Sequence, residues 1–170
     1  MSETFSVADK VVVITGAGQG IGRSFAKAFA SAGTRVVIAE RNVEKARAVE
    51  QEIASGNGQA LVVETDVADE GSVNGLAAAI DQAFGRADVL INNAAIFSTL
   101  EMRPFDQIPV PEWEQVLRVN VTGPFLCARA MLPLMRKTNG AASSTWRRER
   151  SRSAGRTICT TSPRRRHSPA

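Results

Sequence analysis

Apolar and polar positions alternate along the chain in two distinct ways, and this alternation predicts the order of its secondary structure. Four short runs are dominated by apolar, mostly β-branched residues, as expected of buried strands; they cover residues 11–15, 35–40, 60–67 and 87–95. Four longer segments place apolar residues three and four apart, as expected of helices; they cover residues 21–33, 42–54, 71–85 and 111–137. Strands that alternate with helices predict βαβ units and a parallel sheet with helices on both faces.

Residues that begin, end or interrupt helices support this assignment. Gly33 can close the first helix, Asn42 can cap the second, and Pro111 suits the first turn of the last. Pro124 and Pro133 fall inside the last helix and are expected to bend it. Right-handed crossovers make 3-2-1-4 the natural strand order. The predicted fold class is α/β, a doubly wound, Rossmann-like parallel sheet truncated after its fourth strand and fourth helix.

Charge divides the chain into a body, residues 1–140, and a tail, residues 141–170. Eight of the 21 lysines and arginines lie in the tail with Glu149 as its one acidic residue, so the tail carries about +7 and the body about −3. The Arg/Ser-rich tail has no apolar periodicity, which predicts a disordered, solvated segment. A basic tail can also bind nucleic acid, but we disfavour this alternative because Trp146 is the one aromatic among the arginines.

Apolar residues make up 44% of the chain. The way they are distributed, together with the few cysteines and histidines, argues against a secreted protein, a membrane protein and a metal-dependent protein. The first ten residues lack the features of a secretory signal, and no apolar run approaches the ~18 residues of a membrane span. Two cysteines and one histidine offer no spacing for a metal cluster. Cys127 lies in an apolar helical run and is expected in the core. We therefore expect a cytoplasmic protein without a metal site.

The turn after the first strand carries the clearest candidate chemistry. Its sequence is Thr-Gly-Ala-Gly-Gln-Gly-Ile-Gly over residues 15–22, directly after a buried strand and at the start of a helix. Glycines let the backbone approach a pyrophosphate closely, and the helix N-terminus supplies N–H donors and a partial positive charge. In this context the turn predicts a nucleotide-binding site.

The end of the second strand bears on which dinucleotide would bind. Glu40 lies 18 residues after Gly22, where a carboxylate accepts hydrogen bonds from ribose hydroxyls and repels a 2′-phosphate. Arg41 follows it and would be placed to receive that phosphate instead. Glu40 therefore favours NAD as the cofactor, while Arg41 leaves NADP open.

Four motifs in chain order resemble the classical short-chain dehydrogenase/reductase family over residues 8 to about 140. They are the glycine-rich turn at 15–22, Asp66-Val67 after the third strand, Asn-Asn-Ala-Ala at 92–95, and Asn-Val-Thr-Gly from Asn120. Ala95 departs from the family pattern, which has glycine there. The resemblance implies an NAD(P)-dependent oxidoreductase that interconverts a small-molecule secondary alcohol and a ketone, as a homo-oligomer. The candidate cofactor-binding residues are Gly16, Gly18, Gln19, Gly20, Ile21, Gly22, Glu40, Arg41, Asp66, Val67, Asn93, Ala94 and Ala95.

The resemblance also implies four catalytic groups, of which this chain carries one. Asn120 corresponds to the family's asparagine, whose helix bend holds a water in a proton relay. The family's serine, tyrosine and lysine, which hold the carbonyl and move the proton, are expected after Asn139. The chain has no tyrosine, and its last lysine is Lys137. We therefore expect this chain to be inactive, or to be a non-catalytic dinucleotide-binding remnant.

A one-base shift of the reading frame is our hypothesis for the origin of the tail. Codon boundaries from Gly140 to Arg148 can encode Gly-Ile-Val-Asn-Val-Ala-Ser in the shifted frame, ending on the serine. Boundary Thr160/Thr161 can encode tyrosine, and Arg164/Arg165 can encode lysine. The shifted serine and tyrosine lie 13 residues apart and the tyrosine and lysine 4 apart, which is the family's usual spacing. We favour a frameshift over an evolved tail, and the coding DNA decides between them.

The missing half of the fold would line most of the substrate pocket, so the substrate is open. The loop 96–110 is expected to form one wall, and Phe97, Leu100 and Met102 hint at an apolar substrate, although such residues more often anchor a loop. A sheet that stops after four strands exposes an edge and apolar helix faces. We therefore expect low stability or aggregation.

Overall fold

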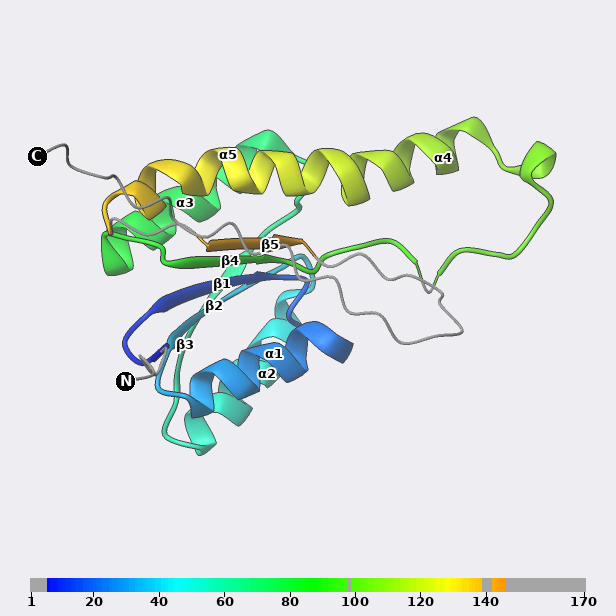
Figure 1. Cartoon of the computed structure of the whole chain (residues 1–170). Coiled ribbons are helices and arrows are strands. Elements are labelled where there is room, and N and C mark those ends of the chain that lie inside the picture. The colour runs from blue at the N-terminus through cyan, green and yellow to red at the C-terminus, as the bar shows by residue number, and fades with distance from the viewer. Residues whose placement is uncertain (1–5, 98, 139–141, 146–170) are drawn as a thin grey trace, which may run out of the picture.

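The parallel sheet expected from the sequence is confirmed in a computed structural model of the chain (Figure 1), which describes residues 6–97, 99–138 and 142–145. Four strands lie at the predicted places: β1 (Val11–Thr15), β2 (Arg35–Glu40), β3 (Gln59–Glu64) and β4 (Val89–Asn92). The bounds of β1 and β2 are as predicted, whereas β3 and β4 each end three residues earlier than predicted. They lie in the order β3-β2-β1-β4, and each neighbouring pair is parallel. The predicted 3-2-1-4 arrangement is therefore correct.

A fifth strand, β5 (Ala142–Thr145), continues the sheet beyond the four strands expected. It runs parallel to β4, with Ala142 opposite Val89 and Thr145 opposite Asn92. The sequence Ala-Ser-Ser-Thr lacks the apolar run that predicted the other strands, but a parallel ladder is made by backbone groups that every residue carries. The sheet thus extends past residue 140. The disorder expected of 146–170 concerns residues outside those described.

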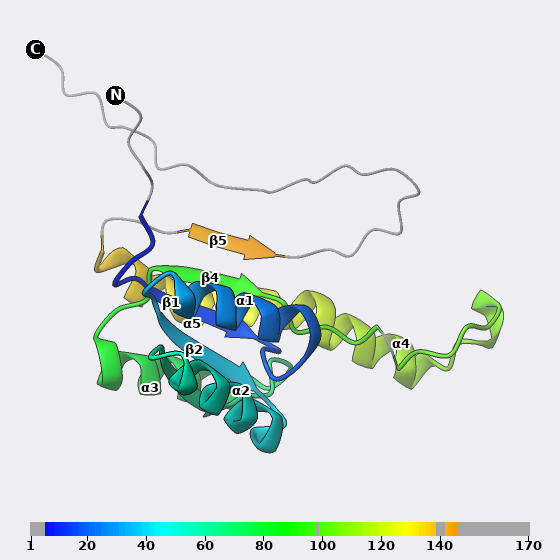
Figure 2. The same ribbon diagram turned by 90° about the horizontal axis from the view of Figure 1, so that it is seen from below.

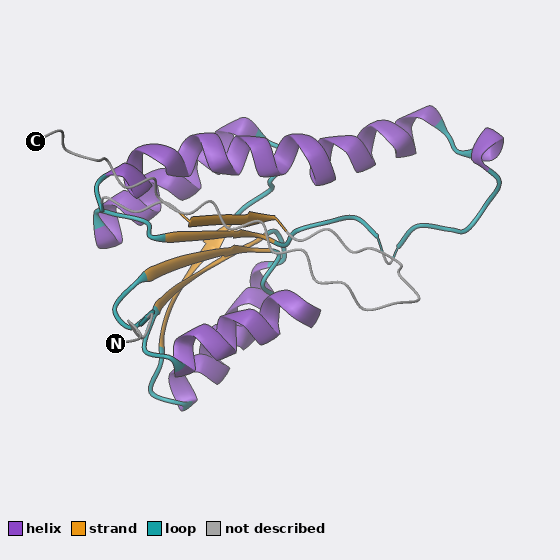
Figure 3. Cartoon of the chain, viewed as in Figure 1, coloured by secondary structure: helices purple, strands orange, loops and turns teal. Residues whose placement is uncertain are grey.

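Helices cover both faces of the sheet (Figures 1, 2 and 3). Helices α1 (Gly20–Ser31) and α2 (Val43–Ser55) lie on one face, and α3 (Glu70–Phe84) and α5 (Gly123–Arg136) lie on the other. Val12 and Ile14 of β1 pack into the α1–α2 core, whereas Val11 and Val13 pack into the α3–α5 core. Both faces of β1 are thus buried, which explains its uninterrupted apolar sequence.

The long last helix consists of three joined parts. Helix α4 (Val110–Leu117) passes into a π-helical turn, η2 (Arg118–Thr122), and then into α5. Pro124 has no N–H to donate to the carbonyl of Asn120 four residues earlier, so the irregularity expected there takes the form of a π turn. In the part of the chain that the structure describes, no helix is long and apolar enough to cross a membrane.

One buried carboxylate fastens the edge of the sheet where β1 and β4 begin. Asp88 Oδ2 accepts a hydrogen bond from the backbone N of Val11 at 2.9 Å. The same carboxylate forms ion pairs with Arg86 at 3.1 Å and Lys10 at 3.6 Å, and its side chain is 6% exposed. This clamp lies at the amino ends of the strands, opposite the edge that carries the predicted site.

Candidate dinucleotide site

The predicted site residues gather at one edge of the sheet, because the carboxyl ends of parallel strands lie together. The glycine-rich turn follows β1, Glu40 ends β2, Asp66 follows β3, and Asn93 follows β4. Figure 3 shows these connections as loops at the end where the strand arrows point. The chain leads from β1 to β2 on one side of β1, and it later leads from β3 to β4 on the other side of β1. The strand order therefore reverses at β1, and the carboxyl end of β1 is a topological switch point, where open α/β sheets bind ligands.

Close backbone approach explains two of the glycines in the turn. A Cβ on Gly16, whose φ is +66°, would lie 2.8 Å from the Cα of Ala94. A Cβ on Gly22 would overlap the carbonyl oxygen of Gly16 and lie 2.5 Å from Nδ2 of Asn93. The start of α1 is therefore packed directly against the loop after β4, with no room for a side chain between them.

Thr15 and Asn93 hold these two loops together. The Thr15 hydroxyl accepts hydrogen bonds from the backbone N of Asn93 and of Ala94, both at 3.0 Å. Nδ2 of Asn93 donates to the carbonyls of Thr15 and Gly16, also at 3.0 Å. Thr15 was not among the predicted site residues, although it is the first residue of the glycine-rich motif at 15–22. Asn93 reaches the site edge as predicted, and its cofactor contact stays a prediction.

The N-terminus of α1 points its unpaired N–H groups at this edge. Gln19 occupies the capping position, but no side chain caps the helix and its first turn contains no acidic residue. The Gln19 amide oxygen instead accepts a hydrogen bond from Nζ of Lys45 at 2.7 Å. The helix dipole and the backbone donors of Gly20 and Ile21 are thus left for a ligand anion.

The carboxylate of Glu40 crosses from the end of β2 to the glycine-rich turn. Its Oε2 accepts from the backbone N of Gly18 at 3.1 Å, and its Oε1 accepts from the backbone N of Asn42 at 3.0 Å. A carboxylate has about four acceptor positions, so roughly two remain for hydroxyl donors of a ligand. Glu40 therefore meets the geometric requirement of a ribose-binding carboxylate.

A hollow beside Glu40 brings Arg41 and Asp66 together, as the sequence predicted for site residues. Helix α4 and η2 form its other wall, and its lining residues are Arg41, Asp66, Ala68, Asp69, Pro111, Glu114, Gln115, Arg118 and Val119. Asp66 Oδ1 accepts from the backbone N of Ala68 at 2.9 Å, which fixes the loop after β3. Val67 is buried and lies against Gly123.

Asn120 lies in the π turn and contacts the loop after β4. Its Oδ1 accepts from the backbone N of Ile96 at 2.8 Å, and its Nδ2 donates to the carbonyl of Ile96 at 3.0 Å. Both polar groups of the side chain are therefore satisfied by one residue. Cys127, one helical stretch further, is buried as expected, and burial raises the pKa of its thiol to about 11, so it is no nucleophile at neutral pH.

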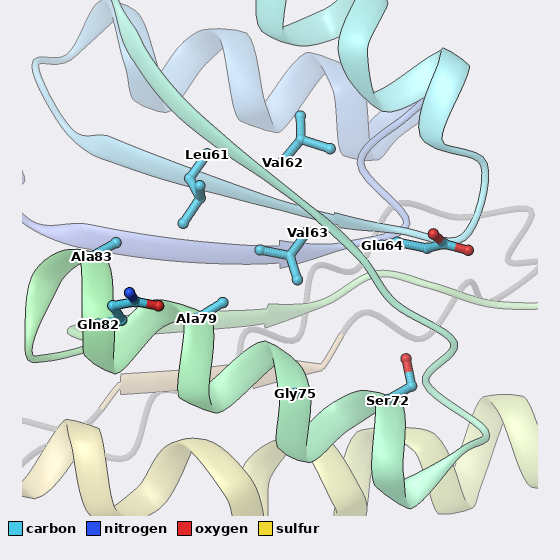
Figure 4. Close-up of a pocket in the computed structure, with 9 residues that line it drawn as sticks. All are labelled: Leu61, Val62, Val63, Glu64, Ser72, Gly75, Ala79, Gln82 and Ala83. Carbon is cyan, nitrogen blue, oxygen red and sulfur yellow. The ribbon is translucent and has the colours of Figure 1, made fainter.

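A second hollow lies away from these residues, between the edge strand β3 and α3 (Figure 4). Val63 faces α3 while Val62 faces the opposite side of the sheet, and small residues on α3 leave the space open. Its lining residues are Leu61, Val62, Val63, Glu64, Ser72, Gly75, Ala79, Gln82 and Ala83. None of the predicted site residues lines it, and we assign it no chemistry.

The site at the carboxyl edge fits a dinucleotide. A Cβ added at Gly16, Gly18 or Gly22 would lie too close to neighbouring atoms, the helix N-terminus is uncapped, and the Glu40 carboxylate is held beside the glycine-rich turn. Ala95, which stands where the family pattern has glycine, is exposed, so its methyl group is accommodated. No cluster of three potential metal ligands occurs among the residues that the structure describes.

Comparison with known proteins finds dehydrogenases and oxidoreductases that are similar to this chain. A family model described as short chain dehydrogenase matches residues 10–143. An uncharacterized oxidoreductase of Thermotoga maritima is 42% identical over 131 residues, which are 77% of this chain and 50% of the relative. Galactitol 2-dehydrogenase of Agrobacterium fabrum is 39% identical over 127 residues, 75% of this chain and 47% of the relative.

A solved structure agrees with the sequence relatives. The crystal structure of a metagenomic short-chain oxidoreductase in complex with NADP superposes with a TM-score of 0.75 at 35% identity, over 83% of this chain and 63% of that one. The chain spans about half the length of the curated relatives that it matches.

Proposed function

The chain belongs to the short-chain dehydrogenase family, and on that premise we propose that it binds a nicotinamide dinucleotide, with NAD preferred, at the carboxyl edge of its sheet. We propose further that it represents the cofactor-binding part of an oxidoreductase that interconverts a secondary alcohol and a ketone. Galactitol 2-dehydrogenase, by its name, acts on a secondary alcohol, which supports this substrate class.

The uncapped N-terminus of α1 above the glycine cradle is the observation that carries the binding proposal. Gly16 and Gly22 bring the backbone against the loop after β4, and a pyrophosphate would lie on the N–H groups of the first turn. The hollow lined by Arg41, Asp66 and Val119 lies at the same edge of the sheet, and it would receive the adenosine end. A bound nicotinamide would supply or accept the hydride.

The preference for NAD rests on Glu40. Its carboxylate is held by two backbone N–H groups beside the glycine-rich turn, and there it would face the 2′ position of the bound ribose. The carboxylate would repel the negative charge of a 2′-phosphate, whereas ribose hydroxyls would donate hydrogen bonds to the free acceptor positions of the carboxylate. Arg41 is exposed beside it and would offer a compensating charge to a 2′-phosphate.

We propose that this 170-residue chain does not itself catalyse the reaction. The acid/base tyrosine of the family has no counterpart, because the sequence contains no tyrosine, and no lysine follows Lys137. Asn120 is present, and its amide holds the loop after β4 beside the site. A non-catalytic dinucleotide-binding remnant therefore describes this polypeptide, while the oxidoreductase describes the intact family member.

The position of β5 supports the frameshift hypothesis for the tail. Residues 142–145 lie parallel to β4, and in the shifted frame the boundaries that start within these codons can encode Ile-Val-Asn-Val. An apolar run of that kind is typical of a strand in a parallel sheet. The same frame can encode the catalytic serine, tyrosine and lysine that the family resemblance implies.

An exposed apolar stripe on the long helix supports a homo-oligomer for the intact family member. The stripe runs along α4, η2 and the start of α5 and consists of Val110, Trp113, Leu117, Val121 and Phe125. Contiguous exposed apolar surface of this kind marks an interaction site or an aggregation hazard. In this chain, which ends its family match at residue 143, aggregation is the expected consequence.

Titration of the purified chain with NADH and NADPH, followed by nicotinamide fluorescence, tests the proposal. Saturable binding with NADH tighter than NADPH is the expected result. Turnover of secondary alcohol or ketone substrates above background would overturn the proposed inactivity. Absence of saturable binding would overturn the proposed site.

A further inference from the structure

Gly18, in the middle of the glycine-rich turn, is enclosed by the side chains that the proposed ribose site depends on. A Cβ at this position would lie 2.9 Å from Cγ of Glu40, 3.1 Å from its Cδ and 3.0 Å from Cβ of Lys45. Gly18 itself is buried, and its φ is not in the left-handed region. Glycine is therefore needed at residue 18 because it leaves room for the Glu40 side chain. It is not needed for a backbone conformation that only glycine adopts.

The backbone of Gly18 is also a partner of the Glu40 carboxylate. Its N–H donates to Oε2 at 3.1 Å, while the N–H of Asn42 donates to Oε1 at 3.0 Å. The carboxylate is thus fixed from two sides, by the turn after β1 and by the residue that caps α2. Charge-assisted hydrogen bonds of this type hold a side chain in one rotamer.

Lys45 connects the first turn of α2 to the glycine-rich turn. Its Nζ donates to the amide oxygen of Gln19 at 2.7 Å, and its backbone N is capped by Oδ1 of Asn42 at 3.0 Å. The first turn of α2 is therefore tied to the glycine-rich turn on the far side of Gly18. Of the two neighbours that an added Cβ would meet, Lys45 Cβ is fixed to its helix, and the flexible Glu40 side chain has to give way.

We propose that Gly18 is a specificity-determining residue, which selects NAD over NADP by leaving the space in which the Glu40 carboxylate lies across the turn. The residue acts through Glu40 and is a positioning residue. This inference rests on the proposed function, because it presupposes a dinucleotide whose ribose faces Glu40. Any side chain at residue 18 displaces the carboxylate, which removes an acceptor from the ribose and a repulsive charge from the 2′ position.

The test compares the dissociation constants of NADH and NADPH for the full 170-residue chain and for Gly18→Ala, measured by nicotinamide fluorescence. NADH binding is expected to weaken about five- to tenfold, which corresponds to the loss of roughly one hydrogen bond. NADPH binding is expected to change by less than about twofold, because the lost repulsion offsets the distorted turn. The measured quantity is the ratio of the two constants.

Two further variants separate specificity from general damage. Gly75→Ala on α3 is the matched control, because a Cβ there meets nothing within 4 Å, and it is expected to leave both constants unchanged. In a Glu40→Ala background, Gly18→Ala is expected to leave the ratio unchanged, because the carboxylate through which it acts is gone. Thermal melting of each variant reports any loss of folding.

The possible outcomes divide clearly between this inference and the proposed function. Equal weakening of NADH and NADPH by Gly18→Ala, or no change in either, overturns the specificity role of Gly18 while the binding site stands. Failure of the unmodified chain to bind either dinucleotide overturns the proposed function and this inference with it. A change in ratio that persists in the Glu40→Ala background contradicts the route through Glu40.

Discussion

Asn120 holds the backbone of Ile96 with both polar atoms of its side chain, accepting from the N–H at 2.8 Å and donating to the carbonyl at 3.0 Å. The pair joins the π turn in the long helix to the loop that follows β4, residues 24 apart in sequence. Because Pro124 leaves the carbonyl of Asn120 without its usual helical donor, the helix is irregular where this contact forms. The asparagine therefore supports the shape of the site edge in addition to the relay role that the family resemblance implies.

Replacement of Asn120 by alanine is expected to lower the free energy of unfolding by about 1–3 kcal/mol, since it leaves two backbone groups of Ile96 without a partner. Urea denaturation measures this change. Asn74→Ala is the control, because Asn74 is exposed on α3, and it is expected to change stability by less than about 0.5 kcal/mol. Equal effects of the two variants would contradict the structural role of Asn120.

Gly22→Ala is expected to abolish dinucleotide binding and to destabilise the fold by about 1–3 kcal/mol, because its Cβ would overlap the Gly16 carbonyl and the Asn93 amide. Gly75→Ala, with open space around its Cβ, is expected to be neutral or slightly stabilising. Thermal melting together with NADH titration of both variants makes the comparison. Retained NADH affinity in Gly22→Ala would show that the turn does not form the cradle described.

Asp88 provides a prediction at the opposite edge of the sheet. Asp88→Ala leaves the N–H of Val11 without its partner and is expected to cost about 1–3 kcal/mol of unfolding free energy. Asp106→Ala is the control, because Asp106 is exposed in the short 3-10 helix Phe105–Gln107. Urea denaturation at neutral pH measures both. Since the site lies at the other edge, NADH affinity at a temperature where Asp88→Ala is folded is expected to be unchanged.

Cys127 carries a prediction about pH. Burial raises the pKa of its thiol to about 11, above the ~8.5 of an unfolded thiol. The stability that this raised pKa contributes is complete below about pH 8.5 and is lost as the pH rises towards 11. At pH 8 the native thiol is expected to react with iodoacetamide about 100-fold more slowly than in urea, followed by mass spectrometry of its peptide. Similar rates in both states would show that the thiol is accessible.

The coding DNA tests the origin of the tail. A one-base shift near codon 140 is expected to open a frame that encodes serine, tyrosine and lysine at the boundaries Arg147/Arg148, Thr160/Thr161 and Arg164/Arg165. Expression of that frame is expected to yield a protein that oxidises secondary alcohols. A stop codon in the shifted frame, or the absence of the Tyr-x-x-x-Lys pattern, would end the frameshift hypothesis.

The sequence predicted the fold where burial dictated composition. Strands β1 and β2 are apolar on both faces, so their observed bounds equal the predicted ones, and Asn42 caps α2 as expected. Strand β5 escaped prediction because its pairing is made by the backbone and its Ala-Ser-Ser-Thr sequence shows no apolar run. The apolar pattern of the sequence therefore predicts a strand only where burial of its side chains decides the structure. It does not predict a strand that forms by backbone pairing with a neighbouring strand.

The residue types of the candidate site could be predicted from the sequence, but the hydrogen bonds that connect its loops could not. The glycine spacing could be predicted because it is a pattern of neighbouring residues. Glu40 could be predicted because it ends a strand that the sequence indicates. The contacts of Lys45 with Gln19 and of Thr15 with Asn93 join residues 26 and 78 positions apart. Such contacts arise only when the sheet brings the loops together, so no local pattern could have indicated them.

Titration of the unmodified 170-residue chain with NADH tests directly whether the carboxyl edge of the sheet binds a nicotinamide dinucleotide. NADH is expected to bind saturably and more tightly than NADPH. This binding is expected to be lost in Gly22→Ala and to be accompanied by no turnover of secondary alcohols or ketones. Absence of saturable NADH binding by the folded chain, as judged by its circular dichroism and cooperative melting, would contradict this expectation.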